Sequence, residues 1–246
     1  MKNNLFKSIA LAMHFVIVIM GSIAIFMQIF LSPDRRNRVS TSGADVFRFF
    51  TIDGNIFIII SSIIVIAYII ISFFKEIKND KFLYVIQLMG AVSALLIFLT
   101  VVFLLLPSYG TSLLKGYKMI ILHATNPILC CMTFLLFNET KISKKMSLLG
   151  ILPMAIYGVI ALILCFSKVW TGRLIPYPFL KVYQNPWWQT VLYIFIMFGG
   201  SMGIAVFFSL ISPKLYLMDK SNTGIIIIFS ITFMVIIGLT LLLILL

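Results

Sequence analysis

Residues Ile56–Phe74 read IFIIISSIIVIAYIIISFF, a run of nineteen residues that contains no charged side chain. The run is apolar on every side, whereas a strand of a membrane barrel alternates apolar and polar residues. Lipid offers no partner for backbone N–H and C=O groups, so a spanning segment must bond them within the protein, and a helix does this by itself. Because about 20 apolar residues cross the hydrocarbon core, this stretch predicts a transmembrane helix.

The same kind of segment occurs seven times along the chain. Of the 246 residues, 62% are hydrophobic, against about 45–50% in a soluble domain. The short connections between the segments leave no room for a soluble domain. We therefore expect an all-α fold, a polytopic transmembrane bundle of about seven helices that forms one domain over residues 1–246. The predicted spans are Leu5–Leu31, Phe49–Phe74, Phe82–Leu106, Met119–Phe137, Met146–Phe166, Gln189–Ile211 and Thr223–Leu246.

Glycines and prolines mark two further features of these spans. Gly199, Gly200 and Gly203 lie at helical spacing in the sixth span and predict close packing against another helix. Pro127 and Pro153 lie within spans, where a proline kinks the helix and frees a backbone carbonyl.

The net charge of +12 would indicate nucleic-acid binding in a soluble protein. Here the Lys and Arg residues lie in the connections, where they meet lipid headgroups and set the topology. We therefore expect membrane lipids as partners and no nucleic acid. Cys130, Cys131 and Cys165 lie inside predicted helices without the spacing of a zinc site, so we expect no metal and no other cofactor. The oligomeric state stays open.

The orientation depends on the connections. We call the membrane surface at the N-terminus side A and the opposite surface side B. Side A carries ten Lys residues and side B nine Lys and Arg residues, so the count does not decide. Side A has the short, Lys-rich connections Lys75–Lys81 and Glu139–Lys145, and side B has the longest two, Ser32–Arg48 and Ser167–Trp188. This favours a multi-pass protein of the cell membrane with a cytoplasmic N-terminus.

The connection Ser167–Trp188 is rich in proline and aromatic residues. Aromatic side chains of this kind settle at the membrane interface. We expect an ordered, partly embedded cap over a site on side B, and the alternative is a plain interfacial belt.

Two polar residues are expected at similar depth below side B. Thr51 lies three residues past Arg48, which is about 5 Å of helical rise, and His123 lies five residues past Lys118, which is about 8 Å. Because both spans enter from side B, the match in depth holds in either orientation of the chain.

Each of these residues shares a helix face with an asparagine. Thr51 and Asn55 are four residues apart, and His123 and Asn126 are three apart. Asp53 is rotated about 200° away from Thr51. The two polar faces allow a threonine nucleophile with a histidine base, since a threonine hydroxyl needs such a base. Either amide is then a candidate donor to the oxyanion.

The alternative interpretation is that these polar residues have structural roles and no catalytic one. A threonine in a membrane helix often bonds back to a carbonyl, and a single histidine often only bridges helices. His14, far from side B, is expected to bridge helices in this way. The chain would then be a non-enzymatic membrane protein, such as a small-solute transporter or a receptor-like module. A transporter favours polar groups near the midplane of the bilayer, whereas the cluster here lies near one surface.

Three stretches in a fixed order resemble a known family. They are Phe49–Asn55 (FFTIDGN), Leu122–Pro127 (LHATNP) and Pro176–Leu180 (PYPFL). Together they resemble the bacterial "Pr-six-Pr" membrane proteins and, more distantly, the androgen-induced and androgen-dependent TFPI-regulating membrane proteins. The resemblance spans roughly residues 45–210. Asp53 and Gly54 depart from its pattern, and the family has six helices where seven are predicted here.

The resemblance implies an activity. The distant relatives hydrolyse fatty-acid esters of hydroxy fatty acids with a threonine and a histidine. Carried over, this implies an intramembrane hydrolase or acyltransferase for an acyl-ester lipid substrate, with Thr51 as nucleophile and His123 as base. The residues expected to bind the substrate are Asn55, Asn126, Tyr177 and Asp53.

The odd number of predicted spans gives a test of topology. Reporter fusions at residue 1 and residue 246 should report opposite sides of the membrane. Termini on the same side would contradict the seven-span arrangement.

Overall fold

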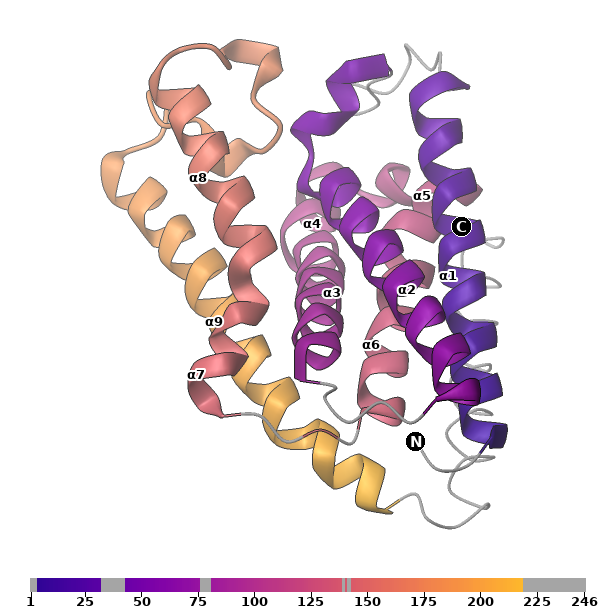
Figure 1. Ribbon diagram of the computed structural model, residues 1–246. Helices are drawn as coiled ribbons and strands as arrows, with labels where there is room; N and C mark the ends of the chain where they lie inside the picture. The colour runs from indigo at the N-terminus through magenta and orange to yellow at the C-terminus, as the bar shows by residue number, and fades with distance from the viewer. Residues whose placement is uncertain (1–3, 32–42, 76–80, 139, 141–142, 219–246) are drawn as a thin grey trace.

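The computed structural model describes residues 4–31, 43–75, 81–138, 140 and 143–218 (Figure 1). This part of the chain contains helices and no strand, so the all-α prediction is confirmed. The seventh predicted span, Thr223–Leu246, lies outside the described residues. The α-helices are α1 (Asn4–Phe30), α2 (Phe50–Phe74), α3 (Lys81–Thr100), α4 (Leu106–Tyr109), α5 (Tyr117–Ile120), α6 (Asn126–Phe137), α7 (Lys144–Ser147), α8 (Leu152–Phe166) and α9 (Trp187–Met218).

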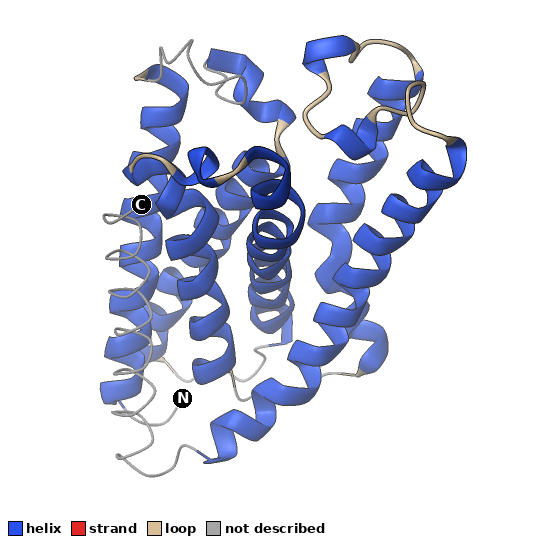
Figure 2. Cartoon of the chain, turned by 180° about the vertical axis from the view of Figure 1, so that it is seen from behind, coloured by secondary structure: helices blue, strands red, loops and turns tan. Residues whose placement is uncertain are grey.

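Six segments in the described part are long and apolar enough to cross a membrane, as a multi-pass membrane protein requires. They overlap the first six predicted spans. Successive segments run in opposite directions, and the connection before α2 lies at the same end of the bundle as the loop between α8 and α9 (Figures 1 and 2). This end is side B. The six segments are Lys7–Phe30, Phe50–Phe74, Lys81–Leu105, Tyr117–Phe137, Lys145–Phe166 and Trp187–Ser212.

The third span forms the centre of the bundle. Its helix α3 packs against α2, α6 and α9. Of its apolar stretch 56% is buried, as in the fourth span, against 22% in the span of α9. Tyr84, Phe134 and Phe208 join α3, α6 and α9, with ring centroids 5.2 and 5.5 Å apart. On the outer faces of α8 and α9, apolar side chains such as Ile163 and Phe195 are exposed, as expected of surfaces that face lipid.

Polar side chains link the helices inside the bundle. The Nδ1 atom of His14 in α1 lies 3.1 Å from the Ser62 hydroxyl in α2, and both residues are buried. The predicted bridging role of His14 is therefore confirmed. Helices α1 and α6 approach each other closely at Gly21 of α1, where a Cβ atom would collide with the amide of Asn126 in α6.

In the described part of the chain no helix packs against the three glycines of α9, unlike what the sequence predicts. No described atom outside the helix's own backbone lies within 4 Å of the position that a Cβ atom would take at Gly199, Gly200 or Gly203. All three glycines are exposed among the described residues, because neighbouring helices contact the other side of α9.

Candidate functional site

Thr51 lies at the start of α2, in the first helical turn. A 3-10 turn, Gly43–Arg48, leads to Phe49, which is extended (φ −100°, ψ 124°) and provides no side-chain cap. The first N–H groups of any helix lack partners within the helix. Here the Tyr177 hydroxyl lies near the backbone of Phe50 and Thr51 and near the Thr51 side chain, and it interacts with them. A residue more than a hundred positions away therefore takes the place of the missing cap.

Tyr177 is held rigidly by aromatic neighbours. Its ring stacks on Phe179 at 5.0 Å and meets Phe49 edge-on at 5.8 Å. Only 5% of its surface is exposed. Burial raises the pKa of Tyr177 to about 12, against the opposing effect of its interactions with Thr51 and Phe50. The phenol therefore keeps its proton at neutral pH and can donate it in a hydrogen bond.

The loop between α8 and α9 is ordered around this tyrosine. It contains the 3-10 turns Gly172–Leu174 and Pro178–Leu180, and Leu180 is buried with Tyr177. The Asn185 side chain donates to the Pro178 carbonyl at 3.0 Å and closes the loop on itself. Its buried residues cover the N-terminus of α2, as the predicted cap would, and its embedding in the membrane stays a prediction.

A second tyrosine reaches the same end of α2 from α8. The Tyr157 hydroxyl donates to the Arg48 carbonyl at 2.7 Å and also interacts with the backbone of Phe50. The rings of Tyr157 and Phe50 lie 5.2 Å apart. Two hydroxyls, from α8 and from the loop, therefore fix the end of α2 that carries Thr51.

His123 lies in a π-helical turn, Ile121–Thr125, directly before Pro127. The N–H of Asn126 donates five residues back to the Ile121 carbonyl instead of four residues back to Leu122. If the π pattern continued, residue 127 would donate to the Leu122 carbonyl, but Pro127 has no N–H. The Leu122 carbonyl is thus left without a partner inside its own helix, as the predicted effect of Pro127 required.

Asn55 supplies the missing donor. Its Nδ2 lies 2.9 Å from the Leu122 carbonyl and 2.7 Å from the Thr51 carbonyl, so both amide hydrogens are used. Asn126 extends this link, because its Nδ2 lies 3.4 Å from the Ile17 carbonyl of α1 and 3.5 Å from Oδ1 of Asn55. Both asparagines are fully buried. They tie three helices together next to Thr51 and His123.

The hydrogen bonding of His123 fixes its tautomer. Its Nδ1 lies 2.8 Å from the Met119 carbonyl. A carbonyl can only accept, so Nδ1 carries the proton and, in the neutral ring, Nε2 keeps its lone pair. A histidine in this state can take up a proton at Nε2.

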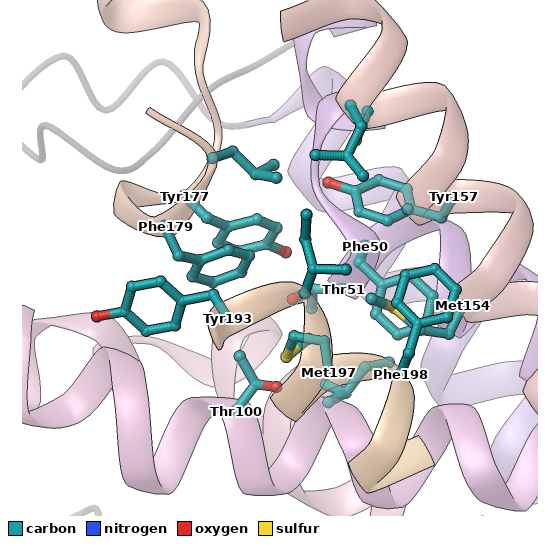
Figure 3. A pocket seen from close by; sticks show the side chains of 16 residues that line it. Phe50, Thr51, Thr100, Met154, Tyr157, Tyr177, Phe179, Tyr193, Met197 and Phe198 are labelled. Carbon is teal, nitrogen blue, oxygen red and sulfur yellow. The ribbon is translucent and has the colours of Figure 1, made fainter. Parts of the chain in front are cut away.

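Two cavities meet at Thr51 and Tyr177. The first, which we call the histidine cavity, has a volume of about 510 Å³ and is also lined by His123, Gln28 and Met119. The second, the apolar cavity, has a volume of about 600 Å³ and lies between α2, α3, α8, α9 and the loop. Figure 3 shows Thr51 in the middle of its aromatic and methionine side chains.

The structure brings some of the predicted site residues together and leaves others out. Thr51, His123 and Tyr177 line the histidine cavity. Asn55 and Asn126 line neither cavity, and their amides are bound to backbone carbonyls between helices, so their expected role in substrate binding or as oxyanion donors stays a prediction. Asp53 is also absent from both walls: it is half-buried in the first turn of α2, on another face of the helix than Thr51.

Sequence reasoning missed other lining residues. Gln28 lines the histidine cavity, and Thr100 and Tyr157 line the apolar one. The sequence feature that could have identified these residues is a polar side chain within an apolar span. Thr133 has the same feature, yet its hydroxyl bonds back to the Cys130 carbonyl at 2.9 Å.

Comparison with known proteins adds no family. No family model, no curated protein and no solved structure matches the chain.

The role of Asn55 gives a prediction of stability. Asn55→Ala leaves the carbonyls of Leu122 and Thr51 without their side-chain donor inside the bundle. We expect the free energy of unfolding to fall by about 1–3 kcal/mol. The measurement is reversible denaturation in mixed micelles.

Asn185→Ala provides the control. It removes one exposed hydrogen bond in the loop between α8 and α9 and should cost less than about 1 kcal/mol. Equal losses in the two variants would contradict the role assigned to Asn55.

Proposed function

We propose that this chain is an intramembrane hydrolase or acyltransferase that acts on fatty-acyl esters, with Thr51 as nucleophile and His123 as base. One observation carries the proposal. Thr51 and His123 line the same cavity, and the bond from His123 Nδ1 to the Met119 carbonyl leaves Nε2 as the proton acceptor. This is the combination that a weak hydroxyl nucleophile needs.

The reaction proceeds in two steps. Nε2 of His123 takes the proton of the Thr51 hydroxyl while Oγ attacks the ester carbonyl. The C–O bond to the alcohol then breaks, the alcohol leaves with the proton from His123, and the acyl group stays on Thr51. In the second step His123 takes a proton from an incoming hydroxyl, which attacks the acyl-threonine; the bond between the acyl carbon and Oγ of Thr51 then breaks, and His123 returns the proton to that oxygen. If the hydroxyl belongs to water the reaction is hydrolysis, and if it belongs to a lipid the reaction is acyl transfer.

The negative charge that develops on the carbonyl oxygen needs hydrogen-bond donors. The Tyr177 phenol is protonated at neutral pH and interacts with the Thr51 side chain. The N-terminus of α2 adds the positive end of the helix dipole. In this proposal the phenol takes the place of the asparagine amides as the donor expected of the site.

The position of Thr51 suits an ester in a bilayer. It is the second residue of α2, at the side B end of a membrane span. The ester carbonyl of a lipid lies near the boundary between headgroups and acyl chains, so a nucleophile at this level meets carbonyls, whereas one at the midplane meets only hydrocarbon.

The proposed pair predicts a specific pattern of loss. Thr51→Ala and His123→Ala should each lower the hydrolysis of a fluorogenic fatty-acyl ester by on the order of 10³-fold or more. The double variant should be no worse than either single one, because nucleophile and base act as one unit. Thr51→Ser, which keeps a hydroxyl, should retain part of the rate.

Matched controls are available within the chain. His14→Ala removes the other histidine, and Thr133→Ala removes a buried threonine hydroxyl that bonds within α6. Both should keep the rate of the folded protein. A fluorophosphonate should label the wild-type chain at Thr51. Full activity in Thr51→Ala, or labelling mapped to another residue, would refute the proposal.

The proposed donor role of Tyr177 predicts a separate effect. Tyr177→Phe keeps the aromatic packing and removes the hydroxyl, so kcat should fall by about 10²–10³-fold. Tyr183→Phe is the control, since its exposed hydroxyl only donates to the Phe166 carbonyl at 2.8 Å in the same loop. Unchanged kcat in Tyr177→Phe, measured with the same ester, would remove Tyr177 from the mechanism.

A further inference from the structure

The apolar cavity begins at Thr51 and has no part in the proton transfer described above. Its walls come from α2, α3, α8, α9 and the loop, and most of its lining is aliphatic, aromatic or methionine side chains. It shares Thr51 and Tyr177 with the histidine cavity. The proposed nucleophile therefore lies at the junction of two cavities, and only the first of them includes the proposed base.

The register of the helices gives the direction of the cavity. Tyr157 bonds to the Arg48 carbonyl, so this part of α8 is level with the start of α2. Met154 lies about one turn, or roughly 5 Å, nearer to side A. On α3, Ile97 also reaches past the start of α2, because a Cβ atom on Gly54 would lie 2.7 Å from its Cδ1 atom. Both side chains line the cavity, which extends from Thr51 toward the hydrocarbon core.

The width of the cavity depends on one glycine and the ring that faces it. A Cβ atom on Gly158 of α8 would lie 3.2 Å from the ring of Phe198 on α9 and 3.8 Å from the methyl group of Met154. Gly158 and Phe198 both line the cavity. A larger side chain at 158 would collide with the Phe198 ring and push it into the cavity, and a smaller side chain at 198 would enlarge the cavity.

We propose that the apolar cavity binds the acyl chain of the substrate, with the acyl carbonyl at Thr51, and that Gly158 and Phe198 set the chain length that it accepts. This rests on the proposed function. The occupant is an unbranched hydrocarbon chain attached to a carboxyl or ester group. An apolar lining favours such a chain, and the hydroxyls of Thr51 and Tyr177 at the mouth suit its polar end. The histidine cavity is left for the alcohol part and for the incoming hydroxyl.

Competition against a photoactivatable fatty acid tests the inference by binding alone. The full chain in nanodiscs is labelled in the presence of saturated fatty acids of increasing length, and lysophosphatidylcholines of the same lengths form a second series. At equal mole fraction in the bilayer, competition should rise with chain length until the cavity is full and then fall, because a longer chain no longer fits. Competition by the first series identifies a free acid as a ligand, and competition by the second identifies an esterified chain.

Variants on the two sides of the cavity should shift this limit in opposite directions. Gly158→Leu should move it to shorter chains, and Phe198→Ala should move it to longer ones. Gly199→Leu is the matched control, because no described atom beyond its own helix backbone lies near that position, and its limit should equal that of the wild type. If Gly158→Leu fails to fold, the shift of the chain-length limit in Phe198→Ala still tests the inference.

The result separates this inference from the proposed function. The same length limit in all variants, or labelling mapped to the lipid-facing side of α8 and α9, would overturn the assignment of the cavity. Thr51→Ala should still bind chains with the wild-type limit. Suppose that Thr51→Ala also keeps full ester hydrolysis, while the cavity variants shift the chain-length limit as expected. The apolar cavity would then still be the acyl-chain site, and the threonine mechanism would be refuted.

Discussion

The Leu122 carbonyl lies inside a membrane span and cannot be left without a hydrogen-bond donor. Pro127 removes one donor and the π turn diverts the other, so the carbonyl must be satisfied from outside its helix. Asn55 does this, and it bonds to the Thr51 carbonyl at the same time. One amide group thereby fixes the start of α2 relative to the turn that carries His123. The juxtaposition of Thr51 and His123 along one cavity depends on this bond.

The start of α2 is stabilised in a second way by distant parts of the chain. It has no side-chain cap of its own, and Tyr157 from α8 and Tyr177 from the loop supply hydroxyls instead. In water, solvent would satisfy such N–H groups, but near the hydrocarbon boundary a protein partner is worth more. The same hydroxyls border the two cavities, so the groups that complete the helix are also those that a reacting ester would meet.

Two cavities with largely apolar walls meet at Thr51, and the first of them also has a histidine and a glutamine in its wall. His123 and Gln28 border one of them, and Met154 and Phe198 border the other. An ester of a fatty acid has a polar linkage at the end of a hydrocarbon chain. The histidine, the threonine and the tyrosine at the junction of two apolar cavities support the proposed activity independently of the three short stretches that resemble a known family.

The sequence by itself determined the helical class and the six spans of the described part. It also placed Thr51, His123 and Tyr177 at the same side of the membrane. These follow from span length, lack of charge and helical rise, which are local properties of each segment. It also indicated that Pro127 would free a carbonyl. Only the tertiary structure decided which groups satisfy that carbonyl and the N-terminus of α2. Asn55 faces the same side of α2 as Thr51, yet its amide is used between helices, while Tyr177 reaches Thr51 from more than a hundred residues away. Hydrogen-bond partners of this kind depend on how spans pack against one another, and spacing within a single helix does not contain that information.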